Sequence, residues 1–166
     1  MYKNLFAWAS ISEKGTKDGK KGNQTGNELK IANYYNFGQN WCISFKNKKM
    51  GKIASEVAKL IVSNRNVGYG QSDRKSLYDE CERIGWDIQR IHEIKPCNCD
   101  CSMLIICCIN FAYGKSFLEY SYTTYSLPKI VERFPDKFKF SNKSLKSLKF
   151  KKGDMVGKSG HVIINV

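Results

Sequence analysis

The feature that most constrains this fold is an apolar segment over residues 102–113, which directly follows a run of alternating cysteines. A helix drawn through this segment carries apolar side chains on nearly every side. A helix of this kind is buried all round, and Gly114 provides a natural C-terminal stop. The sequence therefore predicts a central buried helix against which the other elements pack.

Periodicity in the first half of the chain predicts a strand and two more helices. Residues 41–45 alternate as in a strand, and residues 49–63 carry apolar side chains at helical spacing. Ser72 or Asp73 can cap a further helix, which Gly85 ends. These two amphipathic helices are suited to covering the buried one.

The second half of the chain mixes a short helix with strands. A helix is expected over residues 127–134, strand pieces at 148–150 and 154–156, and a final strand over 160–166. Helices that precede strands favour the α+β class over a doubly wound sheet.

Length and composition predict one domain over residues 1–166. The chain has 166 residues, of which 42% are hydrophobic, which suffices for one core and excludes global disorder. Residues 10–28 are rich in Gly, Lys, Asn and Thr and predict a long polar loop. No apolar run reaches the roughly 18 residues of a membrane-spanning helix. The apolar start is also too short for a signal peptide, so we expect synthesis in the cytoplasm without an export signal.

The charge balance points to an anionic partner. Lys and Arg number 28 against 15 Asp and Glu, a net charge of +13. Nucleic acid, an anionic membrane surface and a polyanionic wall polymer all fit this charge. No helix-turn-helix, zinc-finger or RNA-binding signature is visible, so nucleic acid is not the expected partner.

The seven cysteines are an odd number, and most lie close together in the sequence. Without an export signal they are expected to be reduced thiols. The alternation of Cys97, Cys99 and Cys101 could bind a metal. Structural zinc, however, needs a second ligand pair at matching spacing, and none is present. Neither a metal nor a cofactor is expected.

Cys101 is the candidate nucleophile because it stands where the buried helix begins. The N–H groups and the dipole of a helix N-terminus stabilise a thiolate. The same N–H groups can hold an oxyanion during acyl transfer. The alternative, a purely structural buried thiol, stays open for Cys101 and describes Cys107 and Cys108 well.

A catalytic thiol needs a base, and the chain has only two histidines. His161 opens the final strand after Gly160, a position from which its ring can face a cleft. An ordinary half-buried strand histidine is the alternative. His92 precedes the cysteine run and is interpreted as a surface residue.

These motifs resemble the NlpC-type cell-wall cysteine peptidases, papain-like amidohydrolases, and in particular a phage-encoded, endolysin-like branch. The core of the resemblance is Cys99-Asp100-Cys101-Ser102, then Gly153-Asp154-Met155-Val156, then Gly160-His161-Val162. Other shared segments cover nearly the whole chain: Ala7-Trp8-Ala9-Ser10-Ile11, residues 22–28, Val67-Gly68-Tyr69, Gly85-Trp86-Asp87-Ile88 and residues 96–102. Met103 departs from the small residue usual in the family, and it could narrow the cleft.

The resemblance implies a papain-like α+β fold in which the Cys-bearing helix packs on an antiparallel sheet. It implies that Cys101 is the nucleophile, that His161 is the base, and that Tyr69 lies near the oxyanion. Four further residues are expected to contact substrate: Gln24, Asp100, Ser102 and Gly160.

The family also uses a third polar residue to orient the imidazole. Asn165 is the candidate on the final strand, but it lies about 13 Å along from His161 at ~3.3 Å per residue. Asn23, Gln24, another loop residue or a backbone carbonyl could take the role instead, or the orienting residue could be missing.

The resemblance implies a peptidoglycan hydrolase that cleaves an amide bond in the wall peptide through a Cys–His acyl-enzyme. A catalytically impaired module that binds the wall or another polyanion is the alternative. The positive charge would favour walls that bear teichoic acid. Release through a phage lysis pore would bring the protein to the wall without a signal peptide.

Overall fold

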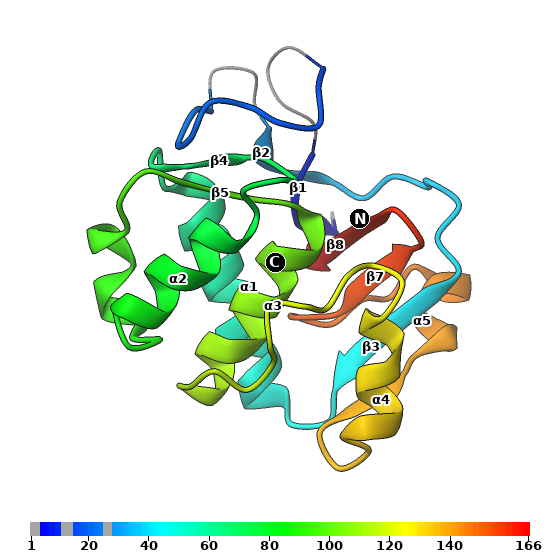
Figure 1. Cartoon of the computed structure of the whole chain (residues 1–166). Coiled ribbons are helices and arrows are strands. Elements are labelled where there is room, and N and C mark those ends of the chain that lie inside the picture. The colour runs from blue at the N-terminus through cyan, green and yellow to red at the C-terminus, as the bar shows by residue number, and fades with distance from the viewer. Residues whose placement is uncertain (1–3, 11–14, 25–27) are drawn as a thin grey trace.

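The computed structural model describes residues 4–10, 15–24 and 28–166. Its centre is a six-stranded antiparallel sheet with strand order β2-β1-β8-β7-β3-β6 (Figure 1). The strands are β1 (Leu5–Ala9), β2 (Leu29–Asn33), β3 (Trp41–Phe45), β6 (Phe138–Phe140), β7 (Met155–Lys158) and β8 (His161–Asn165). The strand β8 thus lies in the interior of the sheet, between β1 and β7.

Three long helices and several short elements complete the fold. The long helices are α1 (Lys48–Ser63), α2 (Lys75–Arg83) and α3 (Cys101–Tyr113). Between them, β4 (Val67–Tyr69) and β5 (Cys97–Cys99) form a separate two-stranded parallel sheet. The short helical elements are η1 (Ile88–Glu93), η2 (Leu127–Lys129), α4 (Ile130–Arg133) and α5 (Asn142–Ser147).

Helix α3 is the buried centre of the helical layer. Every residue of α3 except Tyr113 is buried. Asp100 is its N-cap and accepts a hydrogen bond from the Met103 N–H at 2.7 Å, while Gly114 ends it in the left-handed conformation at φ 64°. The helix packs beside α1 and against the sheet, where it contacts β8.

Each face of the sheet has its own hydrophobic cluster. On β8, Val162 and Ile164 join the main core around α3, whereas Ile163 joins a second cluster with Phe6 and Trp8. Alternate strand residues point to opposite faces, so this division follows from the sequence. The segment of residues 34–40, which has no helix or strand, passes over the second face and links β2 to β3.

Most of the expected elements are present. The strand at 41–45, the helix at 49–63, the buried helix and the final strand are confirmed, and the architecture is α+β with an antiparallel sheet. The strand expected at 148–150 is wrong, because Leu148 adopts φ 51° just after α5. Strands β1, β2 and β6 were not expected.

Of the polar loop expected at 10–28, residues 11–14 and 25–27 lie outside the described residues. Residues 15–24 form turns, and Asp18 makes an isolated bridge to Gly70. Within the described ranges, no helix is long and apolar enough to cross a membrane.

Candidate active site

Cys101 is the first residue of α3, and its side chain lies beside β8. The backbone N–H groups of Val162 and Ser102 lie near the sulfur and favour its thiolate form. Val162 directly follows His161 in β8. The packing of α3 on the sheet therefore brings the thiol against the backbone next to the histidine, although 60 positions separate the two in sequence.

A surface hollow of about 170 Å³ opens over this thiol. Cys101 is only 6% exposed, yet it forms part of the wall of the hollow. The other lining residues are Tyr69, Gln71, Asp100, Ser102, Thr123, Thr124 and Gly160. Met103, by contrast, points into the main core and is fully buried, so it does not narrow this hollow.

An ion pair and its hydrogen bonds hold the N-terminus of α3. The Nε of Arg74 lies 2.9 Å from Oδ2 of Asp100, an ion-pair contact without hydrogen-bond geometry. The same guanidinium donates to Ser102 Oγ at 3.0 Å and to the Tyr122 carbonyl at 2.6 Å. Ser102 in turn donates to Asp100 at 2.9 Å. Asp100 and Ser102 are therefore engaged in fixing the helix start on which Cys101 stands.

The thiol of Cys101 is held in its neutral form. Burial, followed by the negative charge of Asp100, raises its pKa to about 12. The Val162 and Ser102 N–H groups and the Arg74 charge act in the other direction but do not cancel the burial. At neutral pH the sulfur must lose a proton before it can attack.

The His161 ring is also partly withdrawn from water. Burial, assisted by the positive charge of Lys158, lowers its pKa, so the ring is neutral at pH 7. Its Nε2 lies 3.2 Å from the Tyr35 hydroxyl, and its ring meets Phe37 edge-on at 5.0 Å between centroids. Among the described residues, no hydrogen bond joins this ring to the Cys101 thiol directly.

Tyr69, the tyrosine that the family resemblance indicates, lines the hollow over Cys101. It belongs to β4, is 4% exposed, and accepts a hydrogen bond from Gln71 Nε2 at 2.9 Å. Burial raises the pKa of Tyr69 to about 12, so its hydroxyl keeps its proton. Since Gln71 donates to the oxygen, the hydroxyl hydrogen is free to point elsewhere.

The structure does not bring Asn165 or Gln24 to this hollow. The Asn165 side chain donates to the Leu5 carbonyl at 3.0 Å and so supports the β1–β8 pairing. Gln24 donates to the Asn64 carbonyl and lines a different hollow with Gly22 and Arg65. Gly160, in contrast, lines the hollow over Cys101, and its N–H donates to Thr124 Oγ1 at 2.9 Å.

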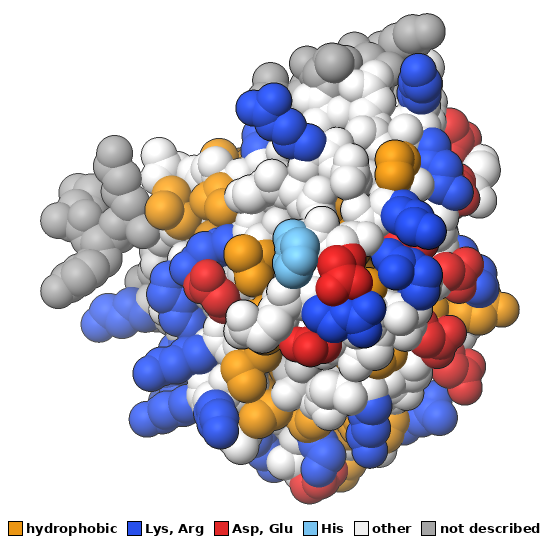
Figure 2. All heavy atoms as spheres, turned by 90° about the vertical axis from the view of Figure 1, so that its left-hand side faces the viewer, with side chains coloured by type: hydrophobic (Ala, Val, Ile, Leu, Met, Phe, Trp, Pro, Cys, Tyr) orange, Lys and Arg blue, Asp and Glu red, His pale blue; other side chains and the backbone are white. Residues whose placement is uncertain are grey.

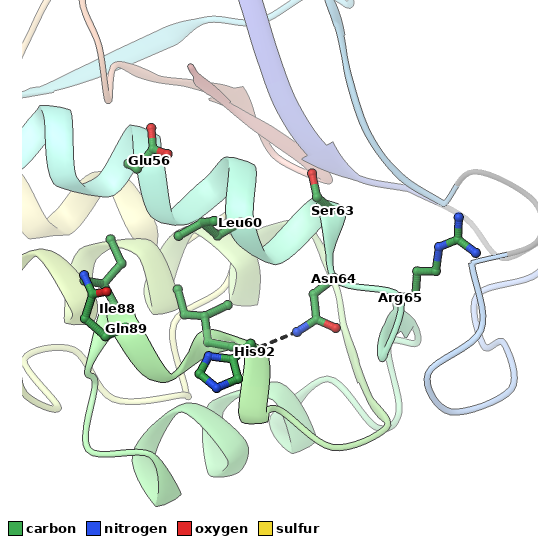
Figure 3. A pocket seen from close by; sticks show the side chains of 9 residues that line it. Glu56, Leu60, Ser63, Asn64, Arg65, Ile88, Gln89 and His92 are labelled. Carbon is green, nitrogen blue, oxygen red and sulfur yellow. Dashed lines mark hydrogen bonds between the residues drawn. The ribbon is translucent and has the colours of Figure 1, made fainter.

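The second histidine belongs to another region. A hollow of about 680 Å³ lies between the C-terminal half of α1 and η1. Figure 3 shows His92 and Leu60 on its wall. The Asn64 side chain bridges the two elements by donating to the Ile91 carbonyl at 2.9 Å. His92 is exposed, and this hollow shares no lining residue with the one over Cys101.

All seven cysteines are free thiols. Cys97 and Cys99 are fully buried in the main core. In the described part of the chain, no group of three or more His, Cys, Asp or Glu side chains is placed to hold a metal ion.

The fold and the site together define an α+β domain with a cysteine at the start of a buried helix and a histidine on the adjacent strand. A family model described as an endolysin-like domain matches residues 6–166, and the chain belongs to this family. The endolysin-like part of the resemblance is thereby confirmed, and the family indicates a function related to the bacterial cell wall. Searches of curated proteins and of solved structures each give no significant match.

Proposed function

We propose that this protein is a peptidoglycan hydrolase of the papain-like, NlpC type, which cleaves an amide bond in the wall peptide. The observation that carries this proposal is the position of the Cys101 sulfur. It lies at the start of α3, on the wall of a surface hollow, against the N–H of the residue that follows His161. The family membership supplies the cell-wall context.

In the proposed reaction the neutral His161 ring takes the proton of the Cys101 thiol as the sulfur attacks the amide carbonyl. The new S–C bond turns the carbonyl oxygen into an oxyanion. When the C–N bond breaks, the imidazolium returns the proton to the departing amine. A water molecule, deprotonated by the same ring, then hydrolyses the thioester and frees the thiol.

Two sets of donors at the hollow suit the oxyanion. The first is the backbone at the start of α3, where the Ser102 N–H lies near the sulfur and the helix dipole favours negative charge. The second is the Tyr69 hydroxyl, whose hydrogen is not used by Gln71. Asp100 and Ser102 are assigned to holding the helix start, and Gly160 to forming the wall of the hollow.

The positive charge supports a wall that carries anionic polymer. Four lysines, Phe45, Gly51 and Asp154 surround a further hollow of about 360 Å³, formed where α1 begins and where the chain enters β7; the lysines are Lys48, Lys52, Lys151 and Lys152. Among the described residues, none of the four forms an ion pair. We propose that this lysine hollow contacts the phosphodiester groups of teichoic acid.

The test compares purified wild-type protein with Cys101→Ala on Gram-positive sacculi, with mass spectrometry of the released muropeptides. We expect the wild type to release fragments with one new amine and one new carboxylate, which also identifies the bond cut. We expect Cys101→Ala to release none, while the control Cys42→Ala, a buried thiol on the other face of the sheet, keeps activity.

Equal release by wild type and Cys101→Ala would remove Cys101 from the mechanism. Binding to sacculi without any release by the wild type would instead favour a wall-binding module with an impaired site.

A further inference from the structure

The segment that links β2 to β3 holds a tyrosine against the His161 ring. Tyr35 Oη lies 3.2 Å from His161 Nε2, at hydrogen-bond distance. Tyr35 comes from residues 34–40, which cross the second face of the sheet toward β3. The hydroxyl and the ring therefore meet although 126 positions separate them in sequence.

Aromatic neighbours fix the position of this tyrosine. Its ring meets Trp8 of β1 at 5.3 Å and Phe37 at 5.3 Å between centroids. Phe37 also contacts the His161 ring edge-on. Trp8 is 5% exposed and belongs to the second hydrophobic cluster, so the sheet itself anchors the tyrosine ring.

The charge state of the Tyr35 hydroxyl matters for its contact with His161. Burial, followed by the negative charge of the Cys101 thiolate, raises the pKa of Tyr35. The phenol therefore stays neutral at pH 7. A neutral phenol beside His161 Nε2 is able to donate or to accept a hydrogen bond.

A neutral imidazole carries its proton on only one of its two nitrogens, and the partner of one nitrogen decides the state of the other. To accept the Cys101 proton on Nδ1, the His161 ring must hold its hydrogen on Nε2. When the Tyr35 oxygen is the acceptor, it stabilises this Nε2–H tautomer.

We propose that Tyr35 is the positioning residue for His161: its oxygen accepts Nε2–H and leaves the Nδ1 lone pair free for the Cys101 thiol. The assignment rests on the proposed hydrolase function. It fills the role expected of Asn165, whose side chain is bound to Leu5 instead.

The experiment uses Tyr35→Phe, which removes the hydroxyl and keeps the ring. The control is Tyr34→Phe, which removes a hydroxyl on the same segment that is bonded to Gln39. On sacculi we expect Tyr35→Phe to lower kcat roughly 10- to 100-fold, as for losing the hydrogen-bond partner of a metal-bound histidine, with little change in KM. Tyr34→Phe is expected to keep kcat.

A second measurement needs no activity. In protein labelled with ¹⁵N-histidine, NMR distinguishes the two tautomers, and His92→Gln assigns the His161 signals. We expect a predominant Nε2–H form in wild type and Tyr34→Phe, and a mixture in Tyr35→Phe.

An unchanged tautomer together with an unchanged kcat in Tyr35→Phe would overturn the assignment. If the wild type cuts no wall peptide but the tautomer responds to Tyr35→Phe, the positioning role stands and the proposed hydrolase function fails.

Discussion

Among single residues, desolvation acts on both members of the proposed dyad and leaves both of them neutral. It raises the pKa of the Cys101 thiol to about 12 and lowers that of the His161 ring. A preformed thiolate–imidazolium pair is therefore disfavoured in the free protein. The proton has to move during the attack on substrate, so the rate depends on the fraction of His161 that is unprotonated.

This dependence predicts the acid side of the pH profile. Because the pKa of His161 is lowered, the unprotonated base persists below the ordinary value of 6.5, and kcat/KM should begin to fall only below pH 6.5. Lys158 contributes to the lowering and pairs with His161 across β7 and β8. Lys158→Gln should therefore move the acid limb to higher pH.

The control is Lys139→Gln, which removes one positive charge from the exposed strand β6. It should leave the acid limb in place. An acid limb above pH 6.5 in the wild type, or equal shifts in both variants, would contradict this account.

The sequence could indicate only part of this site. Cys101 is recognisable from its local motif and Tyr69 from the family resemblance. Both line one hollow, and His161 lies on the strand beside it. Arg74 and Tyr35 carry no local signal, because each acts through a partner far along the chain. Asn165 has the right chemistry and the right strand, but it is used to join β8 to β1.

At the level of helices and strands, the elements with a strong period were predictable and the short or fully buried ones were not. Strand β1 is buried on both faces apart from Leu5, so it shows no alternation of polar and apolar residues. Strand β2 is an edge strand with mostly exposed side chains, and β6 has three residues. Their pairing partners, rather than their own sequences, make them strands.

The close contact between α1 and the start of β7 is tested by comparing two glycine substitutions. Gly153 has φ 83°, and a Cβ added there would lie 2.4 Å from the Gly51 carbonyl oxygen. Gly85 has φ 72°, but a Cβ there would meet nothing within 4 Å. Gly85→Ala should cost about 1–2 kcal/mol of unfolding free energy from backbone strain alone. Gly153→Ala should cost about 3 kcal/mol or more, because the clash adds to the strain.

Urea denaturation followed by circular dichroism measures both variants. Equal losses of stability would show that α1 and the start of β7 separate easily, and that their close contact adds nothing.

Across the whole molecule the net charge is +13, and some of the basic side chains form ion pairs while others do not. Figure 2 shows the face that carries α2 and η1, where basic and acidic side chains are interspersed. Several of them form ion pairs, such as Arg83–Glu80 and Arg90–Glu93. The unpaired lysines of the lysine hollow are therefore better placed to attract an anionic polymer.

Binding to walls should depend on these lysines and on salt. The double variant Lys52→Gln/Lys151→Gln, made in Cys101→Ala to prevent cleavage, should bind teichoic-acid-bearing walls about tenfold more weakly at low salt, at roughly 0.5–1 kcal/mol for each charge. The difference should shrink as salt is added.

The control Lys115→Gln/Lys129→Gln removes the same charge from exposed positions away from the lysine hollow. Co-sedimentation with walls before and after chemical removal of teichoic acid measures both. Equal weakening by the two double variants would mean that binding follows net charge, and that the lysine hollow is no site.

The place of β8 in the middle of the sheet also bears on how the protein is made. Its neighbour β7 directly precedes it in the chain, whereas its other neighbour β1 is the first strand, so a translating ribosome must extrude β8 before the sheet can close. Only then do β8, which carries His161, and α3, which carries Cys101, pack together. A nascent or prematurely terminated chain is thus expected to be inert toward the wall of the cell that synthesises it.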